Sequence, residues 1–367
     1  MSISLCMVVR DEAAALPRFL EAVAGCWDEL CVVDTGSIDE TKAILRAAGA
    51  RIVERPWDDD FAAARNASLE MATGDWILVL DPDEFPTPSF AAALRAATAE
   101  PDNGALLVSM RNLLHGGHHR DCALLRCFRN ERSVRYEHRI HEDAGRTVQA
   151  MLERTGLTQR TLAPRILHEG YLRERAESKD KRTRDRRILE AAIAEDPDDL
   201  YLRFKLLEQA RYWDDADLLH RSASDTVHAL AEPGAPLAEI LATAPWGGEL
   251  LTLLAQGCAA TPAGELELID AWSSAVRPGP ALTLRRGELL EGLGRVPEAE
   301  HEYRACLVAD DDGTPQRTTS RPLLGLVRLA LMTGRMDVAR GFCAQALLHA
   351  PQDREALLAS TFLASQP

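Results

Sequence analysis

Short apolar runs alternate with helical segments along the first part of the chain. Residues 3–9 (ISLCMVV) are continuously apolar, which is typical of a strand buried on both faces. Further strand-like runs lie at 29–34, 51–54, 76–80 and 105–110. Helical spacing of apolar residues occupies the intervals at 12–24, 38–48, 61–72 and 89–99. This alternation predicts an α/β domain with a mostly parallel sheet flanked by helices.

Polar residues follow three of these strands where the strands end. They are residues 10–12 (RDE), 34–37 (DTGS) and 81–84 (DPDE). Ligands of parallel sheets bind beyond the carboxyl ends of the strands, so we expect the functional site at this edge. We also expect a turn at Gly36, a helix cap at Ser37 and a helix end at Gly49.

The segment 81–84 places three carboxylates within four residues, at Asp81, Asp83 and Glu84. Anions this close repel one another unless a cation lies among them. A hard divalent cation is held by one or two carboxylates together with substrate phosphates. We interpret the cluster as a metal site, with an acidic surface turn as the alternative.

Two segments outside the acid cluster carry side chains of the kinds that can contact a nucleotide. Asp34 can accept hydrogen bonds from a ribose or a base, and the alternative is a plain turn acid. Arg65 and Asn66 lie too deep in their helix to cap it. Arg65 can make a bidentate contact to phosphate, and an intrahelical ion pair is the alternative.

Two His-Glu pairs, at 141–142 and 168–169, each follow an apolar residue. Histidine is a common metal ligand and titrates near neutrality. A single His-Glu dipeptide is frequent by chance, so the residues alone leave both the functional and the chance interpretation open.

Composition narrows the range of partners. The chain has 367 residues, which favours two or three domains, and a formal net charge of -15, which disfavours nucleic acid and anionic membranes. No apolar run is long enough for a transmembrane segment, and no signal-peptide pattern occurs. The 8 cysteines form no CxxC pair and indicate reduced thiols, so we expect a cytoplasmic protein.

The second half of the chain has helical periodicity and an internal repeat. The segments 290–310 and 331–351 align at an offset of 40 residues, which places Gly294 on Gly334, and residues 210–219 fit more loosely. Small-residue helix pairs with a glycine turn resemble tetratricopeptide repeats. The basic segment 173–187 indicates a solvated helical linker or, alternatively, a rim that faces a phosphate-bearing ligand.

Several stretches together resemble the family 2 glycosyltransferases with the GT-A fold. They are ISLCMVVRDE, VVDTGSIDET, WDDDFAAARNASLEMATGDWILVLDPDE, RCFRNERSVRYEHRIHE and LHEGY. The later stretches resemble a bacterial branch whose catalytic domain carries tetratricopeptide-like repeats. That branch includes enzymes that glycosylate cysteines or serines of peptides. We therefore expect a GT-A domain at 1–172, a charged helical linker at 173–200 and a helical repeat domain at 201–367.

The resemblance implies a nucleotide pocket at the end of the first two strands. The backbone at Val9, together with Arg10 and Glu12, would line it. Asp34 would hold the uracil or ribose end. The family often has Asn where Asp11 stands, which leaves the preferred nucleotide open.

The resemblance also implies how the diphosphate and a metal ion are held. Arg65 and Asn66 would face the diphosphate and the sugar. Asp81 would contact ribose or the metal, Asp83 would bind Mn²⁺ or Mg²⁺, and His168 would complete the metal site. The family commonly has Ala at the middle position of its Asp-x-Asp motif, where this chain has proline, and this change removes no ligand.

The implied activity is that of an inverting, metal-dependent hexosyltransferase that uses a nucleotide diphosphate sugar, with a UDP-sugar as the expected donor. We expect Glu142 to act as the general base that takes the acceptor's proton, with His141 as the second candidate. The acceptor is a peptide Ser, Thr or Cys, or else a small molecule or carbohydrate. The repeats are expected to bind this acceptor or to mediate a homodimer.

Two other classes of protein stay open. A sugar nucleotidyltransferase also holds Mg²⁺ with acids at strand ends, but it usually carries a glycine-rich loop near its N-terminus, and residues 9–12 contain no glycine. A non-catalytic repeat scaffold would keep the catalytic fold without its chemistry, and the intact set of acids argues against this interpretation.

Overall fold

A computed structural model describes residues 1–114, 119–170, 181–231, 237–244, 246–276, 279–310 and 314–366. The chain divides into two compact units, Met1–Leu113 with Asp121–Lys179, and Leu114–Arg120 with Asp180–Pro367. The expected boundary at residue 172 falls outside the described residues. The division at 172 and 200 therefore stays a prediction.

The described part of the first unit is built on an eight-stranded sheet with the order β3-β2-β1-β4-β7-β6-β8-β5. The strands are β1 (Ile3–Val9), β2 (Glu29–Asp34), β3 (Arg51–Glu54), β4 (Trp76–Val79), β5 (Glu84–Pro86), β6 (Asn103–Leu113), β7 (His119–Arg129) and β8 (Thr158–His168). β1 pairs in parallel with β2 and β4, β2 with β3, and β6 with β8. β7 pairs antiparallel with β4, and β5 pairs antiparallel with β8. The predicted mostly parallel sheet is confirmed.

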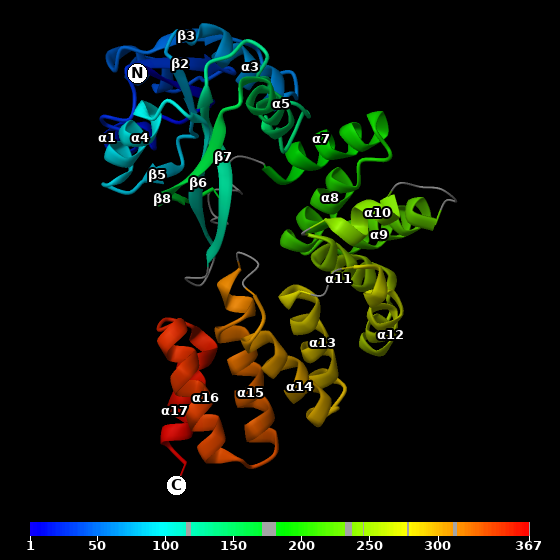
Figure 1. The fold of residues 1–367 in the computed structure, drawn as a ribbon. Coiled ribbons are helices and arrows are strands. Elements are labelled where there is room, and N and C mark those ends of the chain that lie inside the picture. Colours follow the sequence, from blue (N-terminus) through cyan, green and yellow to red (C-terminus); the bar gives the residue numbers. More distant parts are fainter. Residues whose placement is uncertain are drawn as a thin grey trace. The chain divides into compact units, whose positions relative to one another are not determined.

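Helices cover both faces of this sheet (Figure 1). They are α1 (Leu16–Ala22), α2 (Thr41–Ala47), α3 (Phe61–Met71), α4 (Phe90–Ala99) and α5 (Gly145–Thr155). Alternate residues of β1 point to opposite faces of the sheet, so the strand is buried on both faces. Leu5 and Met7 pack into one core with α1, α2 and α4, while Cys6 packs into another with α3 and α5. The continuous apolar run at 3–9 follows from these two cores.

The predicted turn after β2 is confirmed, but its expected helix cap is wrong. Gly36 has φ 110° and Gly49, just beyond α2, has φ 82°, both in the left-handed region that favours glycine. Ser37 does not cap α2, which begins at Thr41 without a side-chain cap. The Ser37 hydroxyl instead accepts a hydrogen bond of 2.9 Å from the backbone N–H of Asp11 and so ties the loop after β1 to the loop after β2.

From residue 181 on, the described part of the second unit is helical. Its helices are α7 (Lys181–Glu195), α8 (Leu200–Tyr212), α9 (Ala216–Ala231), α10 (Leu237–Thr243), α11 (Gly247–Cys258), α12 (Pro262–Trp272), α13 (Pro280–Gly292), α14 (Val296–Leu307), α15 (Ser320–Met332), α16 (Met336–His349) and α17 (Arg354–Ala364). No helix in the described part of the chain combines the length and the hydropathy needed to cross a bilayer. The prediction of an α/β region followed by a helical region is confirmed.

Three helix pairs, α8–α9, α13–α14 and α15–α16, are joined by the same turn. Gly294 and Gly334 have φ 72° and 71°, and Asp214 takes the equivalent place with φ 53°. In each turn the next residue donates its backbone N–H to a carbonyl five residues earlier, at 2.8 to 2.9 Å. The aligned sequence segments therefore correspond to one repeated backbone geometry.

Glu249 is a buried carboxylate that links helices of the second unit. Its side chain is 5% exposed and accepts hydrogen bonds from Arg211 at 2.9 Å and from Arg317 at 2.6 Å. Burial by itself would raise the pKa of this carboxyl. The surrounding arginines, which include Arg120, outweigh burial and lower the pKa of Glu249 to about 2.

We expect the second unit to lose stability in acid through Glu249. Its pKa is about 2 in the folded state against a usual value of 4.5, so the stabilisation is complete above pH 4.5 and is lost as the pH falls toward 2. The shift corresponds to about 3 kcal/mol. Urea unfolding followed by helical circular dichroism should find Glu249→Gln destabilised at pH 7 and less so at pH 3. An equal difference at both pH values would contradict this prediction.

Candidate active site

The turn after β4 presents the acid cluster in a fixed geometry. The backbone N–H of Glu84 donates to the carbonyl of Asp81 at 3.0 Å, which closes a four-residue turn with Pro82 at its second position. β5 then pairs with β8 so that Glu84 lies opposite His168. The pairing of β5 with β8, rather than proximity in sequence, brings the acids next to the histidine.

Asp83 and His168 face each other at this edge. Asp83 Oδ1 lies 3.7 Å from His168 Nε2, and the two side chains are only 14% and 19% exposed. His168 Nδ1 forms a hydrogen bond of 2.7 Å with Asn112 Oδ1. A Cβ placed on Gly170 would lie 2.4 Å from His168 Nε2 and 2.7 Å from Asp83 Oδ2, so a side chain at this position would intrude on both groups.

This pair fits a divalent cation that takes its remaining ligands from a substrate. Within the described ranges, no group of three or more His, Cys, Asp or Glu side chains is placed to hold a metal ion. Asp81 contacts Arg65 in this structure, and its expected part in a set of three metal ligands stays a prediction. Ions such as Mg²⁺ are commonly held by one or two protein groups together with phosphate oxygens and water, and Asp83 with His168 matches that pattern.

Arg65 lies at the centre of a buried ion network. Its guanidinium makes a bidentate contact to Asp81, with N–O distances of 3.0 and 2.9 Å. Its Nε donates to Glu142 at 2.6 Å. Burial by itself would raise the pKa of Asp81, but Arg65 outweighs it and holds the pKa of that carboxyl well below its usual range. The intrahelical pairing considered for Arg65 does not occur, since both partners lie outside α3.

Contacts with α3 put Glu142 beside Arg65. The side-chain amide of Asn66 accepts from the backbone N–H of Tyr136 and donates to its carbonyl, both at 2.9 Å. The backbone N–H of Phe61 donates to the carbonyl of Arg139 at 2.8 Å. Asn66 is thus engaged in holding the segment 136–142, and its expected contact with the diphosphate stays a prediction.

A second ion pair, between Glu84 and Arg126, lies behind the turn. Burial raises the pKa of Glu84 to about 7; Arg126 opposes the rise, and the neighbouring aspartates add to it. Arg126 Nε and the Tyr136 hydroxyl are buried without a hydrogen-bond partner among the described residues. Arg126 was not predicted as a site residue, although a lone arginine inside the apolar run ALLRCF indicates a buried charge.

The nucleotide side of the edge is formed by the ends of β1 and β2. Asp34 Oδ1 accepts from the backbone N–H groups of Gly36 and Ser37, at 3.1 and 2.9 Å. Its Oδ2 is buried and has no hydrogen-bond partner among the described residues, which leaves one acceptor for a ligand donor. The carbonyl of Val9 already accepts from the backbone and hydroxyl of Thr35, at 3.0 and 3.1 Å.

The remaining predicted residues lie nearer the surface. The Arg10 side chain is 56% exposed and lies 3.9 Å from the Asp11 carboxylate. The backbone N–H of Glu12 donates to Thr41 Oγ1 at 2.7 Å, which fixes that loop. His141 is exposed and has φ 54°, a left-handed conformation that is uncommon for a residue with a side chain. No described contact joins these three residues to Asp83 or His168.

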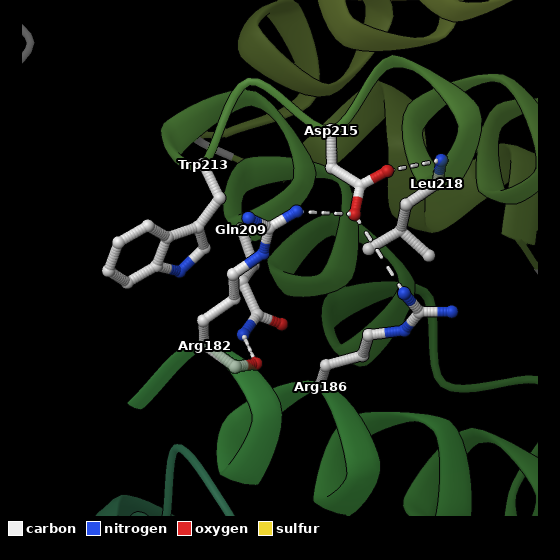
Figure 2. Close-up of a pocket in the computed structure, with 6 residues that line it drawn as sticks. All are labelled: Arg182, Arg186, Gln209, Trp213, Asp215 and Leu218. Atoms are coloured by element: carbon white, nitrogen blue, oxygen red, sulfur yellow. Dashed lines mark hydrogen bonds and ion pairs between the residues drawn. The ribbon is translucent and has the colours of Figure 1, made fainter. Parts of the chain in front are cut away.

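Figure 2 shows a separate hollow in the second unit, lined by Arg182, Arg186, Gln209, Trp213, Asp215 and Leu218. Asp215 lies 3.0 Å from Arg182 and 3.8 Å from Arg186, so one carboxylate faces both cations. Arg186 also pairs with Glu190 at 2.9 Å. These ion pairs favour a structural role for the described part of the basic segment over a phosphate-facing rim, and residues 173–180 lie outside the described ranges.

Comparison with known proteins gives the following similarities. Residues 4–144 match the model described as Glycosyl transferase family 2. A TPR repeat-containing protein of Synechococcus elongatus is 41% identical over 206 residues, which cover 56% of this chain and 51% of that protein. The chain thus spans about half the length of this relative. Glycosyltransferase SunS of Bacillus phage SPbeta is 31% identical over 81 residues, 22% of this chain and 19% of that protein.

Among solved structures, glucosyl-3-phosphoglycerate synthase from Mycobacterium tuberculosis, in complex with Mn²⁺ and UDP-glucose, is 17% identical with a TM-score of 0.34. The similarity covers 52% of this chain and 79% of that chain.

Proposed function

Because residues 4–144 match the Glycosyl transferase family 2 model, we propose that the chain transfers a sugar from a nucleotide diphosphate sugar to an acceptor nucleophile, with inversion at the anomeric carbon. The observation that carries the proposal is the meeting of Asp83 with His168 beside the buried Arg65 network. We propose a UDP-sugar as the donor and a hexose as the sugar.

The residues at the sheet edge are suited to a departing diphosphate. Breaking the bond between sugar and phosphate leaves negative charge on the diphosphate, and Arg65 is a fixed, buried cation near that place. A divalent cation held by Asp83 and His168 would supply Lewis-acid stabilisation of the same charge. Asp34 Oδ2 is an unused acceptor for a ribose hydroxyl or a base N–H.

A panel of UDP-, GDP- and dTDP-sugars, each with and without Mn²⁺, tests the proposal. We expect slow hydrolysis of a UDP-sugar that depends on Mn²⁺. The matched control is a nucleoside triphosphate with a sugar phosphate, which a nucleotidyltransferase would convert instead. Calorimetry with UDP and Mn²⁺ gives an independent answer, because a non-catalytic scaffold would release no heat.

We propose Glu142 as the general base, and we expect Glu142→Gln to lower transfer by at least about 10²-fold with donor binding retained. A glutamine oxygen can still accept the hydrogen bond from Arg65 Nε, so the substitution removes proton acceptance more than geometry. Single-turnover transfer and UDP binding are the measurements. Glu137→Gln, in the same loop, is the control that should stay active. Near-normal turnover of Glu142→Gln would leave His141 as the remaining candidate.

For the acceptor we propose a peptide or protein side chain with a hydroxyl or thiol. Stacked helix pairs with a repeated turn offer an extended surface of the kind that binds peptides. A small molecule or carbohydrate acceptor is the second candidate. Trapping the labelled sugar on peptide or on small-molecule fractions separates the two.

A further inference from the structure

Asn112 is placed to choose which nitrogen of His168 carries a proton. The register of β6 and β8 sets Asn112 opposite His168, and the Asn112 side chain is buried. The amide nitrogen of Asn112 lies 3.4 Å from Cys122 Sγ, which directs the amide oxygen at His168 Nδ1, 2.7 Å away. A carbonyl oxygen only accepts hydrogen bonds, so Nδ1 carries the hydrogen. The neutral imidazole then has its lone pair at Nε2, on the side of Asp83.

Gly170 lies where any side chain would meet both His168 Nε2 and the Asp83 carboxylate. Its missing Cβ would approach His168 Nε2 to 2.4 Å and Asp83 Oδ2 to 2.7 Å, both shorter than any ordinary contact. Gly170 is itself buried, and its φ is not in the left-handed region, so the backbone conformation does not require glycine here. The requirement for glycine comes from the two groups that it faces.

We propose that Asn112 and Gly170 are positioning residues for a divalent cation. Asn112 holds His168 in the tautomer whose Nε2 can bind the ion, and Gly170 leaves the volume that the ion occupies between Nε2 and the Asp83 carboxylate. This inference rests on the proposed function, and it adds two residues that contact neither the sugar nor the nucleotide in that proposal.

Direct Mn²⁺ binding by the full chain in the presence of UDP, followed by electron paramagnetic resonance of free Mn²⁺, tests the role of Asn112. We expect Asn112→Leu to weaken Mn²⁺ binding by about 10–100-fold, the usual effect of losing such a partner of a metal-binding histidine. Asn112→Asp keeps an oxygen acceptor and should retain most of the affinity. Asn103→Leu removes another buried amide of β6, bonded to the carbonyl of Ala97, and should leave Mn²⁺ binding unchanged.

The same measurement tests Gly170. We expect Gly170→Ala to abolish Mn²⁺ binding while UDP binding in the absence of metal stays intact, because the new methyl group enters only the space between the two ligands. Gly341→Ala is the matched control, since a Cβ there meets nothing within 4 Å. A Gly170→Ala chain that binds Mn²⁺ like the wild type would overturn the assignment.

Nitrogen-15 NMR of His168 in the wild-type chain tests the tautomer without any substitution, so its result does not depend on whether a variant folds. The expected result is a protonated Nδ1 and an unprotonated Nε2, and the reverse assignment would overturn the role of Asn112. Wild-type protein that binds neither UDP nor Mn²⁺ would contradict the proposed function, and this inference with it. Wild-type binding that Asn112→Leu and Gly170→Ala both retain would contradict only the positioning roles.

Discussion

Arg65→Leu should abolish sugar transfer and destabilise the first unit by about 3 kcal/mol. The substitution leaves Asp81 and Glu142 as partly buried carboxylates without their common partner. Removing one member of a buried ion pair costs roughly 3–5 kcal/mol. The lower end applies because the Asp81 side chain keeps 28% exposure, through which water can reach it. Chemical denaturation and a transfer assay on the same preparation measure the two effects.

Two further variants separate charge from geometry at this position. Arg65→Lys keeps the positive charge but loses the bidentate fork, so we expect partial recovery of stability and little recovery of transfer. Arg285→Leu breaks a comparable bidentate contact in the second unit, to the buried Glu265. It should lower stability and leave UDP binding intact. Transfer at the wild-type rate in Arg65→Leu would remove Arg65 from the mechanism.

Asp83→Ala should remove the metal-dependent part of donor binding and lower transfer by about 10³-fold or more. Metal ions contribute several kcal/mol to the stabilisation of such charge, and about 4 kcal/mol corresponds to 10³-fold. Unlike Arg65→Leu, this change should not reduce stability, because Asp83 opposes the ionisation of the buried Glu84. Titration of a UDP-sugar with and without Mn²⁺ measures the loss.

The control for this experiment is Asp121→Ala. Asp121 is also a partly buried aspartate and pairs with Arg111, but it is not part of the turn after β4. The Asp121→Ala chain should bind the donor normally. Unchanged UDP-sugar affinity in Asp83→Ala would contradict the assignment of Asp83 to the cation.

The apolar pattern was sufficient for the elements that are buried on both faces. β1 and β2 have the predicted bounds, because each needs apolar residues at successive positions. β3 also has its predicted bounds, although most of its residues are exposed. β8 was not predicted, since most of its residues are exposed or half-buried and its sequence has no regular alternation. β5 has only 3 residues and exists because β8 lies beside it. Strands of this kind depend on partners far away in the chain.

The same limit applies to the candidate site. Asp83 and His168 were recognised as residue types near the expected edge, and strand pairing brings them together. The commitment of Asp81 to Arg65 was not foreseen, because a contact across 16 residues has no local signal. Asn112 also has no local signal in the sequence, since a single asparagine near a strand end is common. Its importance lies in the register of β6 against β8.

In the second unit, the turn shared by the three helix pairs sets the distance between the paired helices largely independently of their exposed side chains. Each turn is closed by a backbone hydrogen bond around one left-handed residue, at Asp214, Gly294 or Gly334. The distance between paired helices therefore depends little on the side chains that they expose. In the proposed function, where these helices bind the acceptor, exchanging those side chains would suit a different acceptor while the helices keep their places.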